Sequence, residues 1–159
     1  MEIKTSIGQD SHRFDFEDKN KKLILGGVVF ENHPPLKANS DGDVVLHSLI
    51  NAISGITGKI ILGKAADEMC KKGITDSKKY LEEALISLEN WKISHISISI
   101  ECKTPKLINK INEMRESIAK LCSVNFNNVC ITATTGEGLT SFGKGEGIQS
   151  ICILTARKP

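Results

Sequence analysis

The fold of this chain is decided by residues 96–121, which read ISISIECKTPKLINKINEMRESIAKL. From Ile96 to Cys102, apolar residues alternate with polar ones, and this pattern predicts a half-buried strand. Pro105 then suits the first turn of a helix. The apolar stripe of that helix repeats at the period of an amphipathic helix and consists of Leu107, Ile111, Met114, Ile118 and Leu121. The stretch therefore predicts a helix layer packed on a sheet.

Strands and one more helix are predicted on both sides of this stretch. Val129, Ile131 and Ala133 alternate with more polar residues and predict a strand, and residues 148–156 predict a final one. Upstream, Asp76 and Ser77 cap a predicted helix whose apolar face includes Leu81, Ala84, Leu85 and Leu88.

The N-terminal part of the chain is less regular. Residues 3–7 alternate and predict a short strand that Gly8 ends, and a hairpin is one possibility for residues 23–30. Residues 43–54 predict a helix that stops near Gly55. The weak pattern from Gly55 to Thr75 is consistent with a long loop or with a short helical piece.

The chain has 159 residues, which is the size of one domain spanning residues 1–159. We expect an α+β fold (an α/β layer) in which helices pack on one face of a mixed β-sheet. Net charge is only +2 and aromatic residues make up 4%, so composition does not favour a nucleic-acid binder. No apolar run approaches the length of a membrane span.

The N-terminus and the cysteines indicate a reducing compartment. The first residues carry no signal or transit pattern, so we expect a cytoplasmic protein, or an organelle lumen if a transit peptide has been removed. Five cysteines without a C-x-x-C pair argue against a disulfide framework. Cys102, Cys130 and Cys152 lie in apolar strand-like runs and are expected to be packing residues.

Three polar clusters interrupt the apolar pattern. Asp10 and His12 project to the same side of an extended segment, so they can converge on one ion. Residues 39–43, Asn-Ser-Asp-Gly-Asp, precede His47, and residues 134–147 are rich in glycines and hydroxyls that suit phosphate oxygens. Each cluster also has an alternative interpretation. The first can be a chance Asp-x-His pair, the second can be a set of helix caps beside a buried histidine, and the third can be a flexible hairpin connection.

Taken together, in this order and spacing, the clusters are far more specific. Asp10-x-His12, Ser40-Asp-Gly-Asp-x-x-x-His47 and Thr134-Thr-x-Glu-x-Leu…Phe-Gly-Lys-Gly-Glu-Gly-Ile148 resemble the 2-C-methyl-D-erythritol 2,4-cyclodiphosphate synthase family of the non-mevalonate route to isoprenoids. The resemblance extends to Leu25-Gly-Gly27, Asp76-Ser77 and Thr104-Pro-Lys-Leu107, and so covers nearly the whole chain.

The resemblance implies an enzyme that cyclises 4-diphosphocytidyl-2-C-methyl-D-erythritol 2-phosphate and releases CMP. The substrate's own phosphate is the nucleophile, so catalysis consists of positioning and charge stabilisation. It also implies a homotrimer with the sheets facing its centre. The active sites would lie between subunits, with Asp10, His12 and His47 from one chain and the cytidine pocket from its neighbour.

By the same resemblance, Asp10, His12 and His47 are ligands of a Zn²⁺-type ion, a set that also permits Co²⁺ or Mn²⁺. Glu137 matches a ligand of a second ion, Mg²⁺ or Mn²⁺, that bridges the substrate diphosphate. Thr135 matches a transition-state-stabilising hydroxyl, and Asn39 stands at the position of a family histidine with a similar role. The residues expected to bind substrate are Asp10, His12, Asn39, Ser40, Asp67, Cys102, Lys103, Thr104, Pro105, Lys106, Leu107, Ile108, Thr134, Thr135, Glu137, Ser141 and Lys144.

Several positions depart from the family pattern. Asn39 cannot carry a charge or move a proton as histidine can, and Asn51 stands where Asp is usual. Residues 59–63 are apolar where the family has Gly-Asp-Ile-Gly, Ser141 replaces a Phe, and Lys144 replaces an Arg. The leading hypothesis is the synthase. The alternatives are a weakened trimer that binds metal and cytidine nucleotide, and a purely structural metal trimer.

Overall fold

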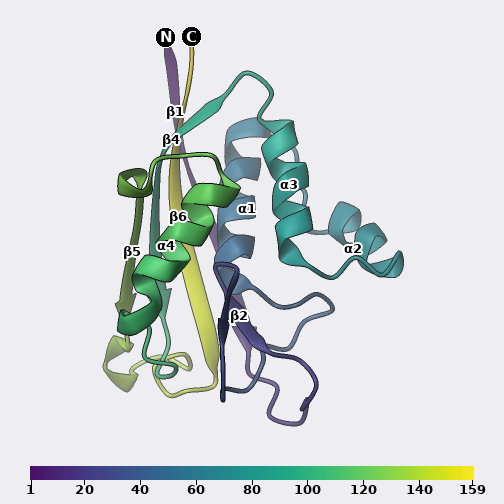
Figure 1. Ribbon diagram of the computed structural model, residues 1–159, viewed down its shortest axis with the longest axis vertical. Helices are drawn as coiled ribbons and strands as arrows, with labels where there is room; N and C mark the ends of the chain where they lie inside the picture. The colour runs from purple at the N-terminus through teal and green to yellow at the C-terminus, as the bar shows by residue number, and fades with distance from the viewer.

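The centre of the molecule is a four-stranded sheet (Figure 1), and the computed structural model describes residues 1–159. The strand order is β1-β6-β4-β5. Neighbouring strands run antiparallel except β4 and β5, which are parallel, so the sheet is mixed as expected. The bounds are Glu2–Arg13 for β1, Lys92–Glu101 for β4, Val129–Thr134 for β5 and Gly147–Lys158 for β6.

Four helices and a small hairpin complete the fold. The hairpin pairs β2 (Leu23–Leu25) with β3 (Val28–Phe30), which confirms that possibility. The helices are α1 (Val44–Thr57), α2 (Lys64–Lys71), α3 (Ser77–Ser87) and α4 (Ile111–Leu121), and short 3-10 turns occur at Ile108–Lys110, Phe126–Asn128 and Gly136–Gly138. The helices lie on one side of the sheet, with α1 against it and α3 beside α1 (Figure 1).

The core forms between this helix layer and one sheet face. In β4, Ile96, Ile98 and Ile100 are fully buried and alternate with exposed residues, as the sequence predicts. The stripe on α4 is also confirmed, because Met114 and Ile118 are fully buried within it. Burial of one face of each element is the main source of stability in such a two-layer arrangement.

The first strand is longer than the sequence predicts. We expected Gly8 to end it, but β1 continues through Asp10 and His12 to Arg13. Gly8 is instead the point where β1 passes closest to α1, since a Cβ there would lie 2.8 Å from the carbonyl carbon of Asn51 and closer still to Ser48 and Ala52. The glycine is needed for close packing, and it does not break the strand.

Three other local expectations need correction. Gly55 lies inside α1, which ends at Gly58 in the left-handed conformation typical of a C-cap. Pro105 precedes the helical segment that begins at Ile108, so it is not in a first turn. Cys130 is exposed, because it points to the uncovered sheet face, whereas Cys102 and Cys152 are buried as expected. The region after Gly55 contains a short helix, α2, which was one of the two expectations.

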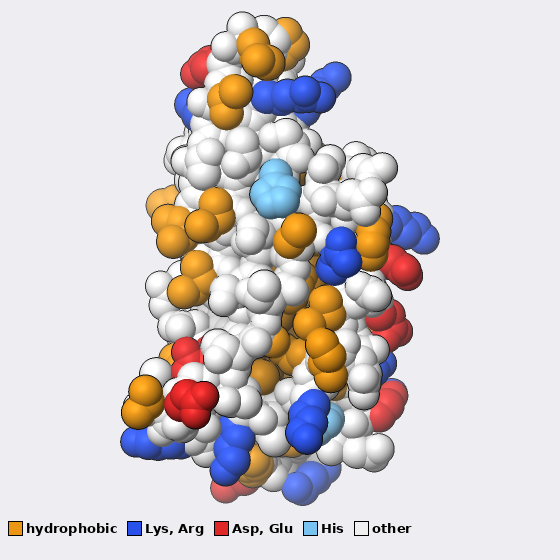
Figure 2. Space-filling view, turned by 90° about the vertical axis from the view of Figure 1, so that its left-hand side faces the viewer, with side chains coloured by type: hydrophobic (Ala, Val, Ile, Leu, Met, Phe, Trp, Pro, Cys, Tyr) orange, Lys and Arg blue, Asp and Glu red, His pale blue; other side chains and the backbone are white.

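The sheet face opposite the helices is uncovered. The side chains of Ile3, Ile7 and Ile153 are 60%, 66% and 46% exposed on it. Figure 2 looks onto this side, where hydrophobic side chains lie among uncharged polar ones and charged side chains gather mainly toward the ends and one edge.

The two ends of the chain lie side by side at one end of the sheet (Figure 1). Glu2 is paired with Lys158 in the register of β1 and β6, and their side chains form an ion pair of 3.6 Å.

None of the helices combines the length and the apolar character that crossing a bilayer would require.

Candidate functional site

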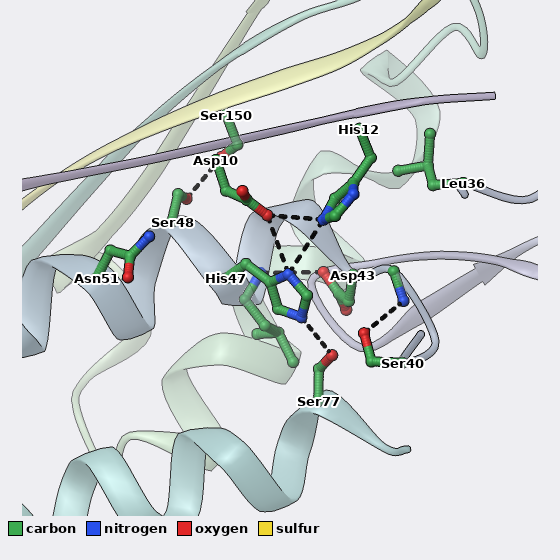
Figure 3. Close-up of polar contacts among 12 residues, drawn as sticks. Asp10, His12, Leu36, Ser40, Asp43, His47, Ser48, Asn51, Ser77 and Ser150 are labelled. Atoms are coloured by element: carbon green, nitrogen blue, oxygen red, sulfur yellow. Dashed lines mark hydrogen bonds and ion pairs between the residues drawn. The ribbon is translucent and has the colours of Figure 1, made fainter. Parts of the chain in front are cut away.

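Asp10, His12 and His47 meet at one point, as the sequence predicts. Asp10 and His12 project from the same face of β1, and His47 lies on the first turn of α1, which packs against that face (Figure 3). Asp10 Oδ2 is 2.8 Å from His12 Nε2 and 2.9 Å from His47 Nδ1. The two histidine nitrogens are 3.3 Å apart.

The local structure explains why α1 presents His47 here. Asp43 is the N-cap of α1 and accepts hydrogen bonds from the backbone N–H groups of Leu46, Gly26 and Gly27 at 2.7–3.0 Å. One carboxylate thus fixes the start of α1 to the turn of the β2–β3 hairpin. Burial raises the pKa of Asp43 to about 6, and the three N–H bonds oppose that shift. Asp43 therefore has a capping role and does not point into the cluster.

Electrostatics within the cluster favour an ionised Asp10. Burial works to raise the pKa of Asp10, but hydrogen bonds and positive charge from His12 and His47 lower it to about 2. The hydrogen bond to Asp10 raises the pKa of His12 above its ordinary value. The three side chains are largely buried, with 25% of Asp10, 21% of His12 and 8% of His47 exposed.

The donor set fits a divalent transition-metal ion. Two imidazole nitrogens and one carboxylate oxygen lie within 4.8 Å of one another, and both histidines use their other ring nitrogen for a hydrogen bond. His12 Nδ1 is 3.1 Å from the carbonyl oxygen of Lys37, and His47 Nε2 is 2.8 Å from Ser77 Oγ. Such outer hydrogen bonds are typical of metal-ligating histidines. Three protein ligands leave a position open for a substrate oxygen, as in catalytic zinc sites.

The cluster forms part of the wall of a cavity of about 450 Å³. Asn39, Ser40 and Asp67 line the same cavity, so the structure brings these sequence-predicted residues together with the three ligands. Leu62 and Gly63, from the apolar 59–63 segment, also line it, as does Asn51. Asn51 Nδ2 donates to the carbonyl oxygen of Gln9 at 3.0 Å, a bond that an ionised Asp could not make.

A second cavity, of about 580 Å³, is lined by most of the residues from Cys102 to Ile108 that are expected to bind substrate. Cys102, Lys103 and residues 105–108 line it from the loop after β4, and Thr134 and Thr135 line it from the end of β5. Because β4 and β5 are parallel, their carboxyl ends meet at this edge. Thr104 is exposed in the same loop but does not line the cavity.

The two cavities share no lining residue, so within one chain the metal cluster and the threonines line separate cavities. Glu137 and Lys144 line neither cavity and are exposed on the glycine-rich loop. Ser141 lines a third hollow of about 230 Å³ together with His12 and Phe142.

The loop that carries Glu137 has an unusual backbone. Gly136, Glu137 and Gly138 all have positive φ angles of 62°, 56° and 69°. Glu137 is the only residue of the three with a side chain, so the flanking glycines lower the cost of this left-handed turn. Thr140 donates a hydrogen bond to Glu101 at the end of β4, and this contact holds the loop against the sheet.

Sequence reasoning missed the residues behind His47. Ser77 was recognised only as part of a helix start, and Asp41 only as a possible cap, but both lie in a hydrogen-bonded chain that reaches the ring of His47. Tyr80 and Cys70 also line the cavity and were not singled out. Their side chains are 2.8 Å apart, with the Tyr80 hydroxyl donating to the carbonyl oxygen of Ile74.

Sequence comparison extends these findings to known proteins. The family model described as "YgbB family" matches residues 3–157. The 2-C-methyl-D-erythritol 2,4-cyclodiphosphate synthase of Chlamydia muridarum is 54% identical over 154 residues, which cover 96% of this chain and 86% of that protein. The synthase of Chlamydia caviae is 53% identical, with 96% and 88% covered.

Solved structures agree with the fold. The bifunctional IspDF of Campylobacter jejuni superposes with a TM-score of 0.89 at 30% identity, covering 99% of this chain, which spans 43% of that longer protein. IspF of Plasmodium falciparum, solved as a CDP complex, has a TM-score of 0.82 at 23% identity, with 98% and 96% covered, and supports the fold alone. The family model and the relatives match nearly the whole chain, so this protein belongs to the YgbB family of 2-C-methyl-D-erythritol 2,4-cyclodiphosphate synthases.

Proposed function

We propose that this protein is a phosphorus-oxygen lyase that converts 4-diphosphocytidyl-2-C-methyl-D-erythritol 2-phosphate to 2-C-methyl-D-erythritol 2,4-cyclodiphosphate and CMP. The relatives named for this activity are more than half identical to it over 96% of its length. The observation that carries the proposal is the convergence of Asp10, His12 and His47 on one point in the wall of a polar cavity.

The reaction needs no nucleophile from the protein. An oxygen of the 2-phosphate forms a bond to the β-phosphorus, the bond from that phosphorus to the bridging oxygen breaks, and the electron pair leaves on CMP. The chain must therefore hold two phosphates in line and balance the charge on their oxygens. A divalent ion held by Asp10, His12 and His47 would supply Lewis-acid stabilisation of a phosphate oxygen.

The remaining roles follow the position of each side chain. Ser40 and Asn39 line the metal-side cavity and can donate hydrogen bonds to substrate oxygens there. Thr134 and Thr135 line the second cavity with residues 102–108, where we place the cytidine diphosphate. Glu137 offers a hard oxygen ligand suited to a second ion, Mg²⁺ or Mn²⁺, and Lys144 offers a positive charge.

We further propose that the working form is a homotrimer whose sheets face the centre and whose active sites lie between subunits. The uncovered sheet face with exposed Ile3, Ile7 and Ile153 supports an interface there. The separation of the two cavities within one chain supports a site completed by a neighbour. Mixing inactive Asp10→Ala and Thr135→Ala chains should then restore part of the activity, because some sites would combine the two intact halves. Sedimentation of the wild type as a monomer would refute the trimer.

The activity is tested by CMP release with Zn²⁺ and Mg²⁺ present and by phosphorus NMR of the product. We expect cyclic diphosphate from the wild type and none from Asp10→Ala. A folded protein that binds Zn²⁺ and CMP but yields no cyclic product would refute the synthase and favour a nucleotide-binding trimer. Failure to bind any cytidine nucleotide would favour a structural metal trimer.

A further inference from the structure

The ring of His47 is held on the side that faces away from the candidate metal site. Its Nε2 atom is 2.8 Å from the hydroxyl of Ser77, the first residue of α3 (Figure 3). Ser77 is fully buried, so no water competes for this hydroxyl. Behind it lies Asp41, from the segment before α1, whose carboxylate accepts the backbone N–H of Ser77 at 3.0 Å and also its hydroxyl proton.

The direction of these bonds decides where the proton of the imidazole sits. A serine hydroxyl has one proton, and Ser77 gives it to the Asp41 carboxylate, which can only accept. The Ser77 oxygen must then accept from His47, which requires a proton on Nε2. A neutral imidazole protonated at Nε2 has its free lone pair on Nδ1, and Nδ1 is the atom that faces Asp10 and His12.

Asp41 is itself fixed in place. Besides both groups of Ser77, it accepts the backbone N–H of Asp43 at 3.1 Å, so its orientation is tied to the start of α1 as well as to α3. His12 has a simpler arrangement, in which the carbonyl oxygen of Lys37 lies 3.1 Å from Nδ1, and Nε2 faces Asp10 at 2.8 Å. The outer partner of each histidine thus requires a proton on the far ring nitrogen, which leaves the nitrogen that faces Asp10 as the one to bind a metal ion.

We propose that Asp41 and Ser77 are positioning residues that lock His47 in its Nε2–H tautomer and fix its ring orientation, so that Nδ1 is ready to bind the metal ion. The inference takes the metal site of the proposed function as given. Neither residue lies in the set that the family resemblance assigns to substrate or metal. Partners of this kind typically change metal affinity by about 10- to 100-fold when they are removed.

The first test is the tautomer of His47 in the Zn²⁺-loaded protein. Long-range proton–nitrogen NMR correlation of histidine-labelled wild type should show His47 protonated at Nε2 and His12 at Nδ1. A wild type whose His47 carries its proton on Nδ1 would overturn the inference, and this measurement needs no variant.

The second test is Zn²⁺ affinity by competition with a chelator. Ser77→Ala should bind Zn²⁺ about 10- to 100-fold more weakly, and Ser77→Thr should restore part of the affinity. Ser48→Ala is the matched control, because Ser48 is equally buried and its hydroxyl bonds Ser150 at 2.7 Å and the carbonyl oxygen of Val45, and not a ligand side chain. Its affinity should stay within about threefold of the wild type.

A folded Ser77→Ala protein that binds Zn²⁺ as tightly as the wild type would contradict the inference. Neither readout depends on turnover. A protein that shows the expected tautomer and the expected affinity loss, but makes no cyclic diphosphate, would refute the proposed function and leave the role of Asp41 and Ser77 standing.

Discussion

Replacing Gly8 with alanine should damage the metal site from a distance. Gly8 lies in β1 two residues before Asp10, opposite the turn of α1 that follows His47. A Cβ at this position would lie 2.8 Å from the carbonyl carbon of Asn51, whereas ordinary contacts begin at 3.4 Å. The atoms in the way belong to the helix backbone, so no side-chain rotation can relieve the overlap.

The size of the effect follows from this overlap. The contact with Asn51 alone requires α1 to move from β1 by 3.4 minus 2.8, or 0.6 Å, and the closer contacts with Ser48 and Ala52 require more. Overpacking of this kind costs about 1–3 kcal/mol, and a backbone overlap falls at the upper end. At about 2–4 °C per kcal/mol for a chain of this size, the melting temperature should fall by roughly 6–12 °C.

The same displacement should weaken metal binding. Asp10 Oδ2 and His47 Nδ1 are now 2.9 Å apart, and moving the helix separates them. We expect a loss of Zn²⁺ affinity of at least about tenfold, equivalent to about 1.4 kcal/mol. Chelator competition measures the affinity, and urea unfolding measures the stability.

Gly58→Ala is the matched control for this prediction. Gly58 has a φ of 74° and open space around it, so alanine there adds backbone strain without pushing α1 from β1. It should cost about 1–2 kcal/mol of stability and leave Zn²⁺ affinity unchanged. If Gly8→Ala kept wild-type affinity, or if Gly58→Ala lost as much, the proposed link between the β1–α1 contact and the site would be wrong.

Three further predictions concern the cluster and the loops. In the metal-free protein, the pKa of Asp10 is lowered from 3.8 to about 2, so ionised Asp10 contributes about 2 kcal/mol to the free energy of unfolding above pH 4, and this contribution is lost as the pH falls toward 2. Urea unfolding across this range should show no such loss in Asp10→Asn. The raised pKa of His12 acts in the opposite sense, so the difference in unfolding free energy between wild type and Asp10→Asn should also shrink as the pH rises above about 6.5. Asn39→His should increase kcat, since a charged donor would then line the cavity, and an unchanged turnover number would contradict this. Gly136→Ala should reduce CMP release at least about tenfold and cost about 1–2 kcal/mol of stability, because alanine strains the left-handed backbone and its Cβ would push away the Glu101 carboxylate that holds Thr140 of the loop; normal turnover would show that the loop position is unimportant.

The elements whose apolar residues recur at a regular period were predicted well from the sequence. The alternation in β4 and the stripe on α4 are confirmed because each reflects burial of a single face, which is local information. The Asp10-x-His12 pair was predicted for the same reason, since alternate residues of a strand share a face.

Features that depend on another element could not be predicted in this way. Whether Gly8 ends a strand or admits a helix depends on α1, which lies about 40 residues later in the chain. The exposure of Cys130 depends on which sheet face the helices cover. The roles of Asp41 and Ser77 depend on α3 packing beside α1, because the sequence alone shows only two residues of a type that often caps helices.

The pairing of the first and last strands has a consequence for how the chain can be rearranged. Glu2 and Lys158 are partners in the sheet, so both ends of the polypeptide leave the molecule at the same place. A short flexible linker could join them, and new ends could be opened in an exposed loop far from Asp10, which would give a circular permutant with the same core. The same arrangement allows a larger polypeptide to carry a domain of this fold through one small attachment area, with the helix layer and both cavities left unobstructed.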